Sequence, residues 1–438
     1  MNDEPSSISN FKTPISDLKS DTFTLLISCA KGIPPYLKEE LTRLGFPIRA
    51  ELEAGVETTG TMNDAMRLNL LLHTGNRVLL ELDRFTAYQP DDLYKRIQLI
   101  AWEDLIPDTG YFTVTSFVNT PAIRDDRFAN VRVKDAIVDR FREKTGHRPD
   151  SGNERSGVVV FLYWNQGDVK IYIDTSGESL SRRGYRKIPL AAPMAESLAA
   201  AVVCATGWTG EGNFVNPMCG SGTLAIEAAL LAQGRPPGLL RSNYGFMHLK
   251  GFDDEAWQKI RQEARVLPKR KFPGRIIASD LRAEAIDAAR QNARTAGVEQ
   301  LIEFMDCDFA ETPVPEGGGV ALFNPEYGMR LGEEEELEPV YRRIGDFFKK
   351  QCMGYTGYVF TGNMILGKMI GLRSSRRILF YNANIECRLL AFKLYEGTKR
   401  QKKDGEGGEK GSGFGSQDAQ GADPVPTTPA PDCLNPEP

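Results

Sequence analysis

Between residues 23 and 175, short apolar runs alternate with stretches whose apolar positions have helical spacing. Apolar or alternating runs predict strands, and helical spacing predicts amphipathic helices. The predicted strands are Phe23–Cys29, Arg77–Phe85 and Tyr111–Val118, followed by a hairpin of Gly157–Trp164 with Val169–Asp174. The predicted helices are Ile33–Leu44, Thr61–His73, Asp91–Ala101 and Phe128–Thr145. This mixture predicts an α+β region with two or three small sheets that are covered by helices on one face.

After Leu190 the alternation becomes longer and more regular. The predicted strands are Asn213–Asn216, Arg275–Ser279, Ile302–Met305, Val320–Phe323 and Tyr355–Thr361, with a final hairpin of Arg377–Tyr381 and Glu386–Leu394. The predicted helices are Ala195–Thr206, Thr223–Ala232, Ala283–Ala296 and Glu338–Gln351, and residues 233–272 form a helix-rich insertion. Strands separated by crossover helices favour an α/β domain with a doubly wound, mostly parallel sheet, which binds ligands at the carboxyl ends of its strands.

The length of 438 residues predicts two or three domains, because a single core stops growing at roughly 250 to 300 residues. Residues 399–438 are mostly Gly, Pro, Ser and charged side chains, which bury too little apolar surface to become ordered. We therefore expect a disordered arm at 1–20, domains at 21–175 and 176–398, and a disordered tail at 399–438.

Further features of the composition narrow the class of protein. Nothing approaches the roughly 18 consecutive apolar residues that a membrane span needs, and the N-terminus is acidic and polar, which predicts a cytoplasmic protein without a membrane partner. The seven cysteines are scattered without a C-x-x-C pair, which predicts reduced thiols and no bound metal. No pattern indicates an oligomeric state.

The most specific motif runs from Phe214 to Thr223 and reads FVNPMCGSGT. A strand that ends in a Gly-x-Gly turn at a helix N-terminus brings backbone N–H groups close to a ligand. The motif lacks the lysine of a phosphate loop, so a small cofactor with a carboxylate and a sugar fits better. The alternative is an ordinary turn between a strand and a helix, which the full string makes less favourable.

Two aspartates follow later strands. Asp280 ends the run IIASD, where a carboxylate can accept hydrogen bonds from ribose hydroxyls. Asp308 follows the strand at 302–305 and can accept from an adenine amino group, with Phe309 beside the ring. The alternatives are a helix N-cap at Asp280, with Glu284 following, and a solvated loop aspartate at position 308.

The run VALFNPEYG, residues 320–328, delivers an amide, a proline and an aromatic ring to a strand end. The exocyclic amine of a base is a weak nucleophile, because its lone pair is delocalised into the ring. The amide oxygen of Asn324 and the Pro325 carbonyl can accept hydrogen bonds from both N–H groups of the amine and so direct its lone pair at a methyl group. Tyr327 can stack on the base. The alternative is a simple Pro-Gly loop.

In this order the motifs resemble the bacterial THUMP-domain class I S-adenosylmethionine-dependent RNA methyltransferases, particularly those that make N2-methylguanine in large-subunit ribosomal RNA. The resemblance covers about residues 22–395. Besides the two loops, it includes three further strings: FANVRVKDAIVDRFREKTGHRP, LSRRGYRKIPLAAPMAESLAAAVV and YNANIECRLLAFKL.

The resemblance implies a Rossmann-like class I methyltransferase domain preceded by a ferredoxin-like element and a THUMP domain, which captures structured RNA. S-adenosylmethionine would be bound through its methionine moiety by Asn216, Pro217, Cys219, Gly220 and Gly222, through its ribose by Asp280 and through its adenine by Asp308. Asn324, Pro325 and Tyr327 would form the catalytic amine-methylating motif.

One departure from the family pattern keeps other functions open. The family usually has a second proline where this chain has Glu326, which gives up loop rigidity and adds a carboxylate. The proposed acceptors on Asn324 and Pro325 remain, so we expect retained activity. The alternatives are a transfer-RNA guanine-N2 methyltransferase, methylation of a glutamine amide, and a non-catalytic RNA-binding or assembly protein derived from such an enzyme.

The net charge of -5 taken alone argues against a nucleic-acid partner, but its distribution reverses that conclusion. Residues 110–190 contain 14 Lys or Arg against 10 Asp or Glu, a local +4. We expect phosphate contacts from two clusters. Their members are Arg124, Arg127, Arg132, Lys134, Arg182, Arg183, Arg186 and Lys187. Ribosomal RNA is the expected partner.

Overall fold

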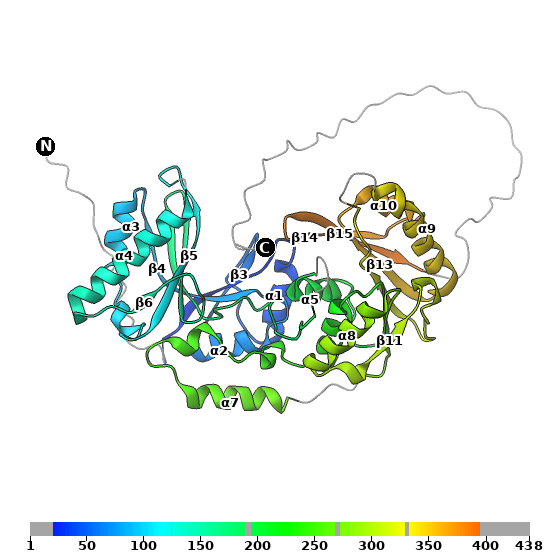
Figure 1. Cartoon of the computed structure of the whole chain (residues 1–438), viewed down its shortest axis with the longest axis horizontal. Coiled ribbons are helices and arrows are strands. Elements are labelled where there is room, and N and C mark those ends of the chain that lie inside the picture. The colour runs from blue at the N-terminus through cyan, green and yellow to red at the C-terminus, as the bar shows by residue number, and fades with distance from the viewer. Residues whose placement is uncertain (1–20, 124, 189–193, 268–271, 329–332, 395–438) are drawn as a thin grey trace, which may run out of the picture.

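The computed structural model describes residues 21–123, 125–188, 194–267, 272–328 and 333–394. Two β-sheets lie towards opposite ends of its longest axis, with α1, α2 and α5 between them (Figure 1). The bounds of these three helices are α1 (Pro34–Arg43), α2 (Met62–Leu71) and α5 (Glu196–Ala205). The predicted disordered arm and tail lie outside the described residues.

The N-terminal half is built on one eight-stranded sheet with the order β2-β3-β1-β4-β8-β7-β5-β6. Its strands are β1 (Phe23–Ser28), β2 (Ala50–Leu52), β3 (Gly55–Gly60), β4 (Arg77–Thr86), β5 (Tyr111–Asn119), β6 (Asp150–Ser151), β7 (Val158–Asn165) and β8 (Asp168–Asp174). The expectation of two or three small sheets is therefore wrong. The reason is β4, which pairs with β1 at one end and with β8 along most of its length, so that it joins the two subdomains.

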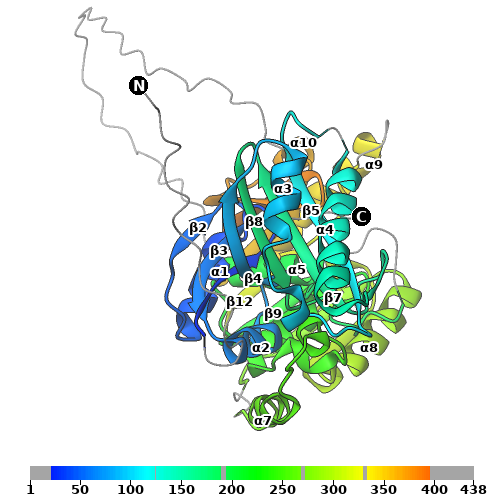
Figure 2. The same cartoon turned by 90° about the vertical axis from the view of Figure 1, so that its left-hand side faces the viewer.

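Helices α3 (Pro90–Ile97) and α4 (Asp126–Thr145) lie together on one face of the β4 to β5 part of this sheet (Figure 2). Buried side chains of α4, including Val133, Ile137 and Phe141, recur at three- and four-residue spacing. The helix begins at the N-cap Asp125, whose side chain accepts from the Arg127 N–H, and ends at Gly146 in the left-handed conformation. One 3₁₀ turn, η1 (Trp102–Asp104), follows α3.

The second sheet has the order β11-β10-β9-β12-β13-β15-β14. Its strands are β9 (Asn213–Pro217), β10 (Ile276–Asp280), β11 (Ile302–Asp306), β12 (Gly319–Phe323), β13 (Tyr355–Thr361), β14 (Arg376–Asn382) and β15 (Ile385–Lys393). All the pairs from β11 to β13 are parallel, and β15 is antiparallel to both β13 and β14. The order reverses direction at β9, which lies between β10 and β12.

Alternation along these strands fills a core on each face of the sheet. On β12, Val320 and Leu322 belong to the core that includes α5 and α6, whereas Ala321 and Phe323 belong to the core under α9. The remaining helices are α6 (Thr223–Gln233), α7 (Asp254–Arg265), α8 (Ala283–Ala296), α9 (Glu333–Gln351) and α10 (Met364–Met369). Short 3₁₀ turns are η2 (Pro237–Leu240), η3 (Gly245–His248), η4 (Glu299–Leu301) and η5 (Phe309–Glu311).

The predicted insertion after α6 lies against the N-terminal half. Helix α7 runs beneath α2 (Figure 1), and the Lys250 ammonium donates to the backbone oxygen of Glu103 at 2.9 Å. None of the helices that the structure describes combines the length and the apolar character that a membrane crossing requires.

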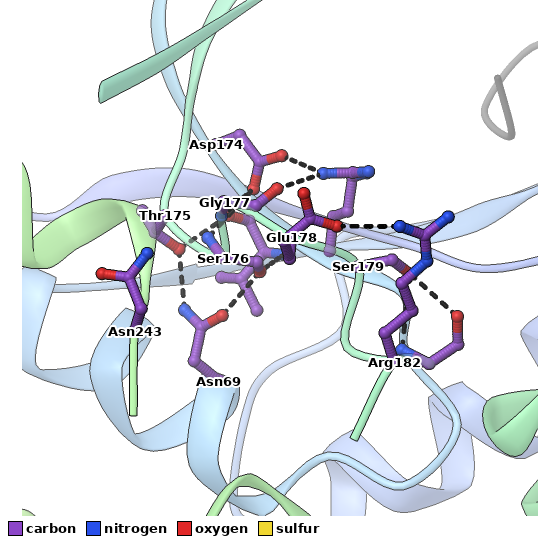
Figure 3. Close-up of polar contacts among 12 residues, drawn as sticks. Asn69, Asp174, Thr175, Ser176, Gly177, Glu178, Ser179, Arg182 and Asn243 are labelled. Atoms are coloured by element: carbon purple, nitrogen blue, oxygen red, sulfur yellow. Dashed lines mark hydrogen bonds and ion pairs between the residues drawn. The ribbon is translucent and has the colours of Figure 1, made fainter. Parts of the chain in front are cut away.

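The chain that connects the two sheets is fixed by side chains from the N-terminal half (Figure 3). Asn69 donates to the Thr175 hydroxyl at 2.8 Å and accepts from the Ser176 hydroxyl at 2.5 Å. Arg77 forms an ion pair with Asp174 and also donates to the backbone oxygen of Gly177 at 2.6 Å. These buried contacts hold the junction between the two halves in one conformation.

Candidate functional site

Four parallel strands, β9 to β12, end at the same edge of the second sheet, and the sequence-predicted cofactor and catalytic residues lie at or just after these ends. The edge includes the point where the strand order reverses, between β9 and its neighbours. Loops diverge at such a point and leave a crevice outside the carboxyl ends of the strands, which is where doubly wound sheets bind ligands. The fold therefore brings together the motifs that lie about 100 residues apart in the sequence.

The glycine loop, residues 216–222, is shaped by left-handed backbone positions. Met218, Gly220 and Gly222 have φ values of 56°, 54° and 82°. Among the described residues, no heavy atom lies within 4 Å of the place where a Cβ on Gly220 would stand. A Cβ on Gly222 would lie 2.8 Å from the Ala289 Cβ of α8, so this glycine permits close helix packing. Gly220 thus leaves open space for a ligand, and Gly222 sets the start of α6.

Asp280 is 8% exposed and shapes the glycine loop from the neighbouring strand. One carboxylate oxygen accepts from the Gly220 N–H at 2.9 Å, and the other accepts from the Arg282 N–H at 3.1 Å. Helix α8 has no side-chain cap at its N-terminus, so the alternative interpretation of Asp280 as an N-cap is wrong. Its remaining lone pairs can accept from hydroxyl groups. The predicted contact with ribose stays a prediction.

Asn216 and Cys219 make contacts inside the protein. The buried Asn216 amide donates to the backbone oxygen of Leu322 at 2.8 Å and so ties β9 to β12, and Pro217 beside it is also buried. In the part of the chain that the structure describes, the Asn216 Oδ1 atom is buried without a hydrogen-bond partner. Burial raises the pKa of the Cys219 thiol, which therefore stays protonated and does not suit a nucleophile.

Asp308 lies at the N-cap of η5 and accepts from the Ala310 N–H at 2.9 Å. Its carboxylate is also paired with Arg343 at 2.6 Å. Partial burial acts to raise the pKa of Asp308, but the bonds from Arg343 and Ala310 outweigh burial and lower it. Phe309, expected beside an adenine ring, is 6% exposed and packs edge-on against Phe323, and its contact with adenine stays a prediction.

The NPEYG loop, residues 324–328, follows β12 directly. Asn324 and Tyr327 are half-buried, Pro325 is buried and Glu326 is exposed. The Tyr327 hydroxyl donates to Asn324 Oδ1 at 3.0 Å, which occupies one lone pair of that oxygen and leaves the other. Burial raises the pKa of Tyr327, so its hydroxyl remains a donor. The structure brings the predicted amide and ring together, and their catalytic roles stay predictions.

Two residues that the sequence interpretation missed hold the NPEYG loop in place. Tyr341 of α9 donates to the backbone oxygen of Glu326 at 3.0 Å. Asn363 donates to the backbone oxygen of Tyr327 at 3.1 Å, while its own side-chain oxygen caps α10. An Asn before a short helical pattern is an N-cap signal that can be found in the sequence. The contact of Tyr341 depends on tertiary packing and has no such local signal.

The predicted RNA contacts differ in their exposure and in the partners that their side chains already have. Lys187 is exposed and Lys134 is half-buried, whereas Arg127 and Arg182 are exposed and pair with the nearby Asp125 and Glu178. All four remain candidates for phosphate contacts. Arg124 lies outside the described residues.

The other described arginines of the two clusters contact other parts of the protein, Arg132 near the surface and Arg183 and Arg186 in more buried positions. Arg132 forms an ion pair with Asp91 at 2.5 Å and lies over the Tyr94 ring, which joins α4 to α3. Arg183 is 1% exposed, so the expectation that it contacts RNA is contradicted by its burial. Arg186 has a side chain that is 16% exposed and donates to the backbone oxygen of Met194 at 2.6 Å. The charge pattern alone does not separate these arginines from the exposed ones.

Across the described ranges, no group of three or more His, Cys, Asp or Glu side chains is arranged to hold a metal ion. Six cysteines that the structure describes are free, and Cys433 lies outside those residues.

Comparison with known proteins identifies the class of the molecule. Sequence profiles described as the RlmL ferredoxin-like domain, the THUMP domain and the RMKL-like methyltransferase domain match residues 24–79, 87–174 and 183–391. The chain therefore belongs to the RMKL-like methyltransferases that carry a ferredoxin-like domain and a THUMP domain. This result confirms the resemblance and the fold class expected from the sequence.

Individual relatives agree with this assignment. "Ribosomal RNA large subunit methyltransferase K/L" of Syntrophotalea carbinolica is 38% identical over 379 residues, which are 84% of this chain and 53% of that protein. A structure titled "predicted N6-adenine-specific DNA methylase" from Listeria monocytogenes is 30% identical, with a TM-score of 0.79 over 87% of this chain and 99% of that one. A structure titled "possible methylase" from Clostridium difficile is 26% identical, with a TM-score of 0.79 over 87% and 100%. The chain spans about half the length of the curated relatives it matches.

Proposed function

We propose that the protein transfers a methyl group from S-adenosylmethionine to the exocyclic N2 amine of a guanine in large-subunit ribosomal RNA. The observation that carries the proposal is the position of the NPEYG loop, which follows β12 beside the glycine loop of β9 at the reversal of strand order. The curated relatives are named for large-subunit ribosomal RNA, and the THUMP match supports an RNA substrate. The cytoplasm is the proposed compartment, since the proposed substrate is ribosomal RNA.

The residues at the strand ends fit a nucleoside cofactor that carries an amino acid. The open space at Gly220 permits close approach of a ligand to the backbone, and Asp280 offers carboxylate lone pairs to ribose hydroxyls. Asn216, Pro217, Cys219 and Gly222 complete the glycine loop, and Asp308 is the proposed partner of the adenine amine. When bound, S-adenosylmethionine supplies a methyl group whose bond to sulfur breaks as a bond to the amine nitrogen forms and a proton is lost.

The NPEYG loop orients the nucleophile. The Asn324 oxygen and the Pro325 carbonyl each accept a hydrogen bond from one N–H group of the guanine amine. These two bonds direct the lone pair of the amine nitrogen at the methyl group. Positioning of this kind can supply about 7 to 11 kcal/mol of the barrier, so no covalent nucleophile is needed. Tyr327 stabilises the base by contact with its ring. Glu326 is exposed and does not displace either acceptor.

Three exposed basic side chains and the half-buried Lys134 supply the RNA contacts in this proposal. Arg127, Lys134, Arg182 and Lys187 would bind phosphates, which positions an RNA without reading its sequence. Glu326 also supports a second candidate, a non-catalytic RNA-binding protein, because it stands where the family resemblance implies a second, rigid proline.

The test is methyl transfer from labelled S-adenosylmethionine to protein-free large-subunit RNA from cells that lack this protein, with transfer RNA and a glutamine-containing peptide in parallel. We expect label in the ribosomal RNA, and nucleoside mass spectrometry should find it in N2-methylguanine. Label in transfer RNA alone would move the substrate to that class. RNA binding without cofactor binding would favour the non-catalytic candidate.

A further inference from the structure

Residues 183–188 form a segment that contacts both halves of the molecule, and we name it the coupling segment. The buried guanidinium of Arg183 donates to the backbone oxygen of His73, just after α2, at 2.5 Å. The same group lies 3.0 Å from the Glu227 carboxylate of α6, and both side chains are almost completely buried. Arg183 therefore connects the N-terminal half to the helix that begins at the glycine loop.

The next residues of the coupling segment contact the same face of α6. The Tyr185 hydroxyl donates to Glu227 Oε1 at 2.9 Å, and Arg186 donates to the Thr223 hydroxyl at 3.1 Å. Thr223 and Glu227 are four residues apart and so lie one turn apart on one side of the helix. Thr223 is the first residue of α6 and directly follows the glycine loop. The segment thus fixes the first turn of α6 as well as its middle.

Asn292 of α8 makes a further connection to the glycine loop itself. Its side-chain oxygen accepts from the backbone N–H groups of Lys187 and Ile188 at 2.9 and 3.4 Å. Its amide group donates to the backbone oxygen of Ser221 at 3.2 Å, and the side chain is fully buried. The side-chain amide of Asn292 therefore connects the backbone of the coupling segment directly to the backbone of the glycine loop.

The buried charges need an explanation beyond stability. A buried ion pair often contributes little to stability compared with apolar side chains of similar volume, whereas it can fix one arrangement of the chain. Burial raises the pKa of Glu227 to about 7, while Arg183 and the Tyr185 hydroxyl act in the opposite direction. The carboxylate is thus held in an unfavourable place by partners that come from the coupling segment.

We infer that Arg183, Arg186 and Asn292 are positioning residues that hold the glycine loop in its cofactor-binding shape and connect it to the RNA-capturing half. This inference rests on the proposed function. It gives Arg183 and Arg186, which belong to a basic motif, a role in shaping the cofactor site instead of a role in binding RNA. The neighbouring Arg182, whose side chain is 59% exposed, keeps its candidate role in phosphate binding.

The test compares three variants, Arg186→Met, Asn292→Ala and Arg182→Ala, by titration calorimetry with S-adenosylmethionine and by RNA binding at several salt concentrations. Each of the first two variants loses more than one hydrogen bond, because Arg186 donates to Met194 and Thr223 and pairs with Glu196, and Asn292 bonds to Lys187, Ile188 and Ser221. These losses should weaken cofactor affinity by about tenfold or more. We expect Arg182→Ala to bind the cofactor within about twofold of the unmodified protein, and to lose RNA affinity with a smaller salt dependence. The fully buried Arg183 is left unchanged, because its substitution risks unfolding.

Calorimetry also separates positioning from a general loss of structure. Partial unfolding lowers the number of binding sites per chain but leaves the dissociation constant of the folded molecules unchanged. Hydrogen exchange without cofactor should show faster exchange at residues 219–226 in Arg186→Met and Asn292→Ala. Unchanged affinity and exchange in both variants would overturn the inference. If the unmodified protein fails to bind the cofactor, the proposed function fails, and exchange still tests the coupling segment.

Discussion

The glycine loop and the NPEYG loop lie at the same edge of one sheet, but the protein holds them in different ways. The glycine loop is fixed by buried groups on several sides, among them Asp280 and Asn292. The NPEYG loop is anchored through backbone oxygens, at Glu326 and Tyr327, and its functional side chains are half-buried.

This difference matches the two tasks that we propose. A cofactor site gains affinity when its shape exists before binding, because no ordering cost remains to be met. A site for a base must admit a bulky nucleotide and then hold it. In the present state the Asn324 oxygen is bonded to the Tyr327 hydroxyl, and entry of an amine would share or replace that bond.

The largest expected effect separates catalysis from cofactor binding. Asn324→Ala removes the side-chain acceptor that orients the amine but leaves the glycine loop intact. We expect the rate of methyl transfer to fall about 100- to 1000-fold, by analogy with the loss of one preorganised hydrogen-bonding group at a reacting centre. Single-turnover kinetics and calorimetry measure the two quantities. If cofactor affinity falls as much as the rate, the amide supports the structure of the whole site.

A smaller effect is expected from the other loop. Asp280→Asn keeps the shape of the side chain but removes the charge that accepts from Gly220 and, as proposed, from the ribose. Hydrogen bonds to charged groups contribute about 1.5 to 3 kcal/mol, so cofactor affinity should fall about 10- to 100-fold. The rate at saturating cofactor should change little. A variant with normal affinity and a slow rate would reverse the assignments of the two loops.

The sequence predicted most elements because their patterns are local. Helix Ala283–Ala296 and strand Tyr355–Thr361 have the bounds that periodicity predicted. The hairpin of β2 and β3 was missed, because β2 has three residues and no buried side chain. The single N-terminal sheet was missed because β4 joins its two parts through pairings between distant segments, which no local pattern shows.

The sequence predicted those parts of the candidate site whose positions depend only on where the parallel strands end. Glycine, aspartate and asparagine after parallel strands lie at one edge whatever the details of packing. Charge patterns do not distinguish Arg182 from Arg183. These two residues are adjacent in the sequence, but the side chain of Arg182 is exposed and that of Arg183 is buried. A usable signal was Glu227, the one charged residue in the apolar helix LAIEAALLA, since a carboxylate in a helix that is buried all round requires a partner.

The smallest expected effect concerns the hydroxyl of Tyr327. Tyr327→Phe removes the donor to Asn324 but keeps the ring, whose position against Gly362 does not involve the hydroxyl. If the hydroxyl only occupies the amide until a base enters, the rate should change by less than about threefold, since a half-exposed neutral hydrogen bond contributes little. Tyr327→Ala, which also removes the ring, should lose about ten times more activity if stacking holds the base. Equal losses of activity in the two variants would show that the hydroxyl, and not the ring, is required. The NPEYG loop would then depend on a defined side-chain hydrogen bond, as the glycine loop does.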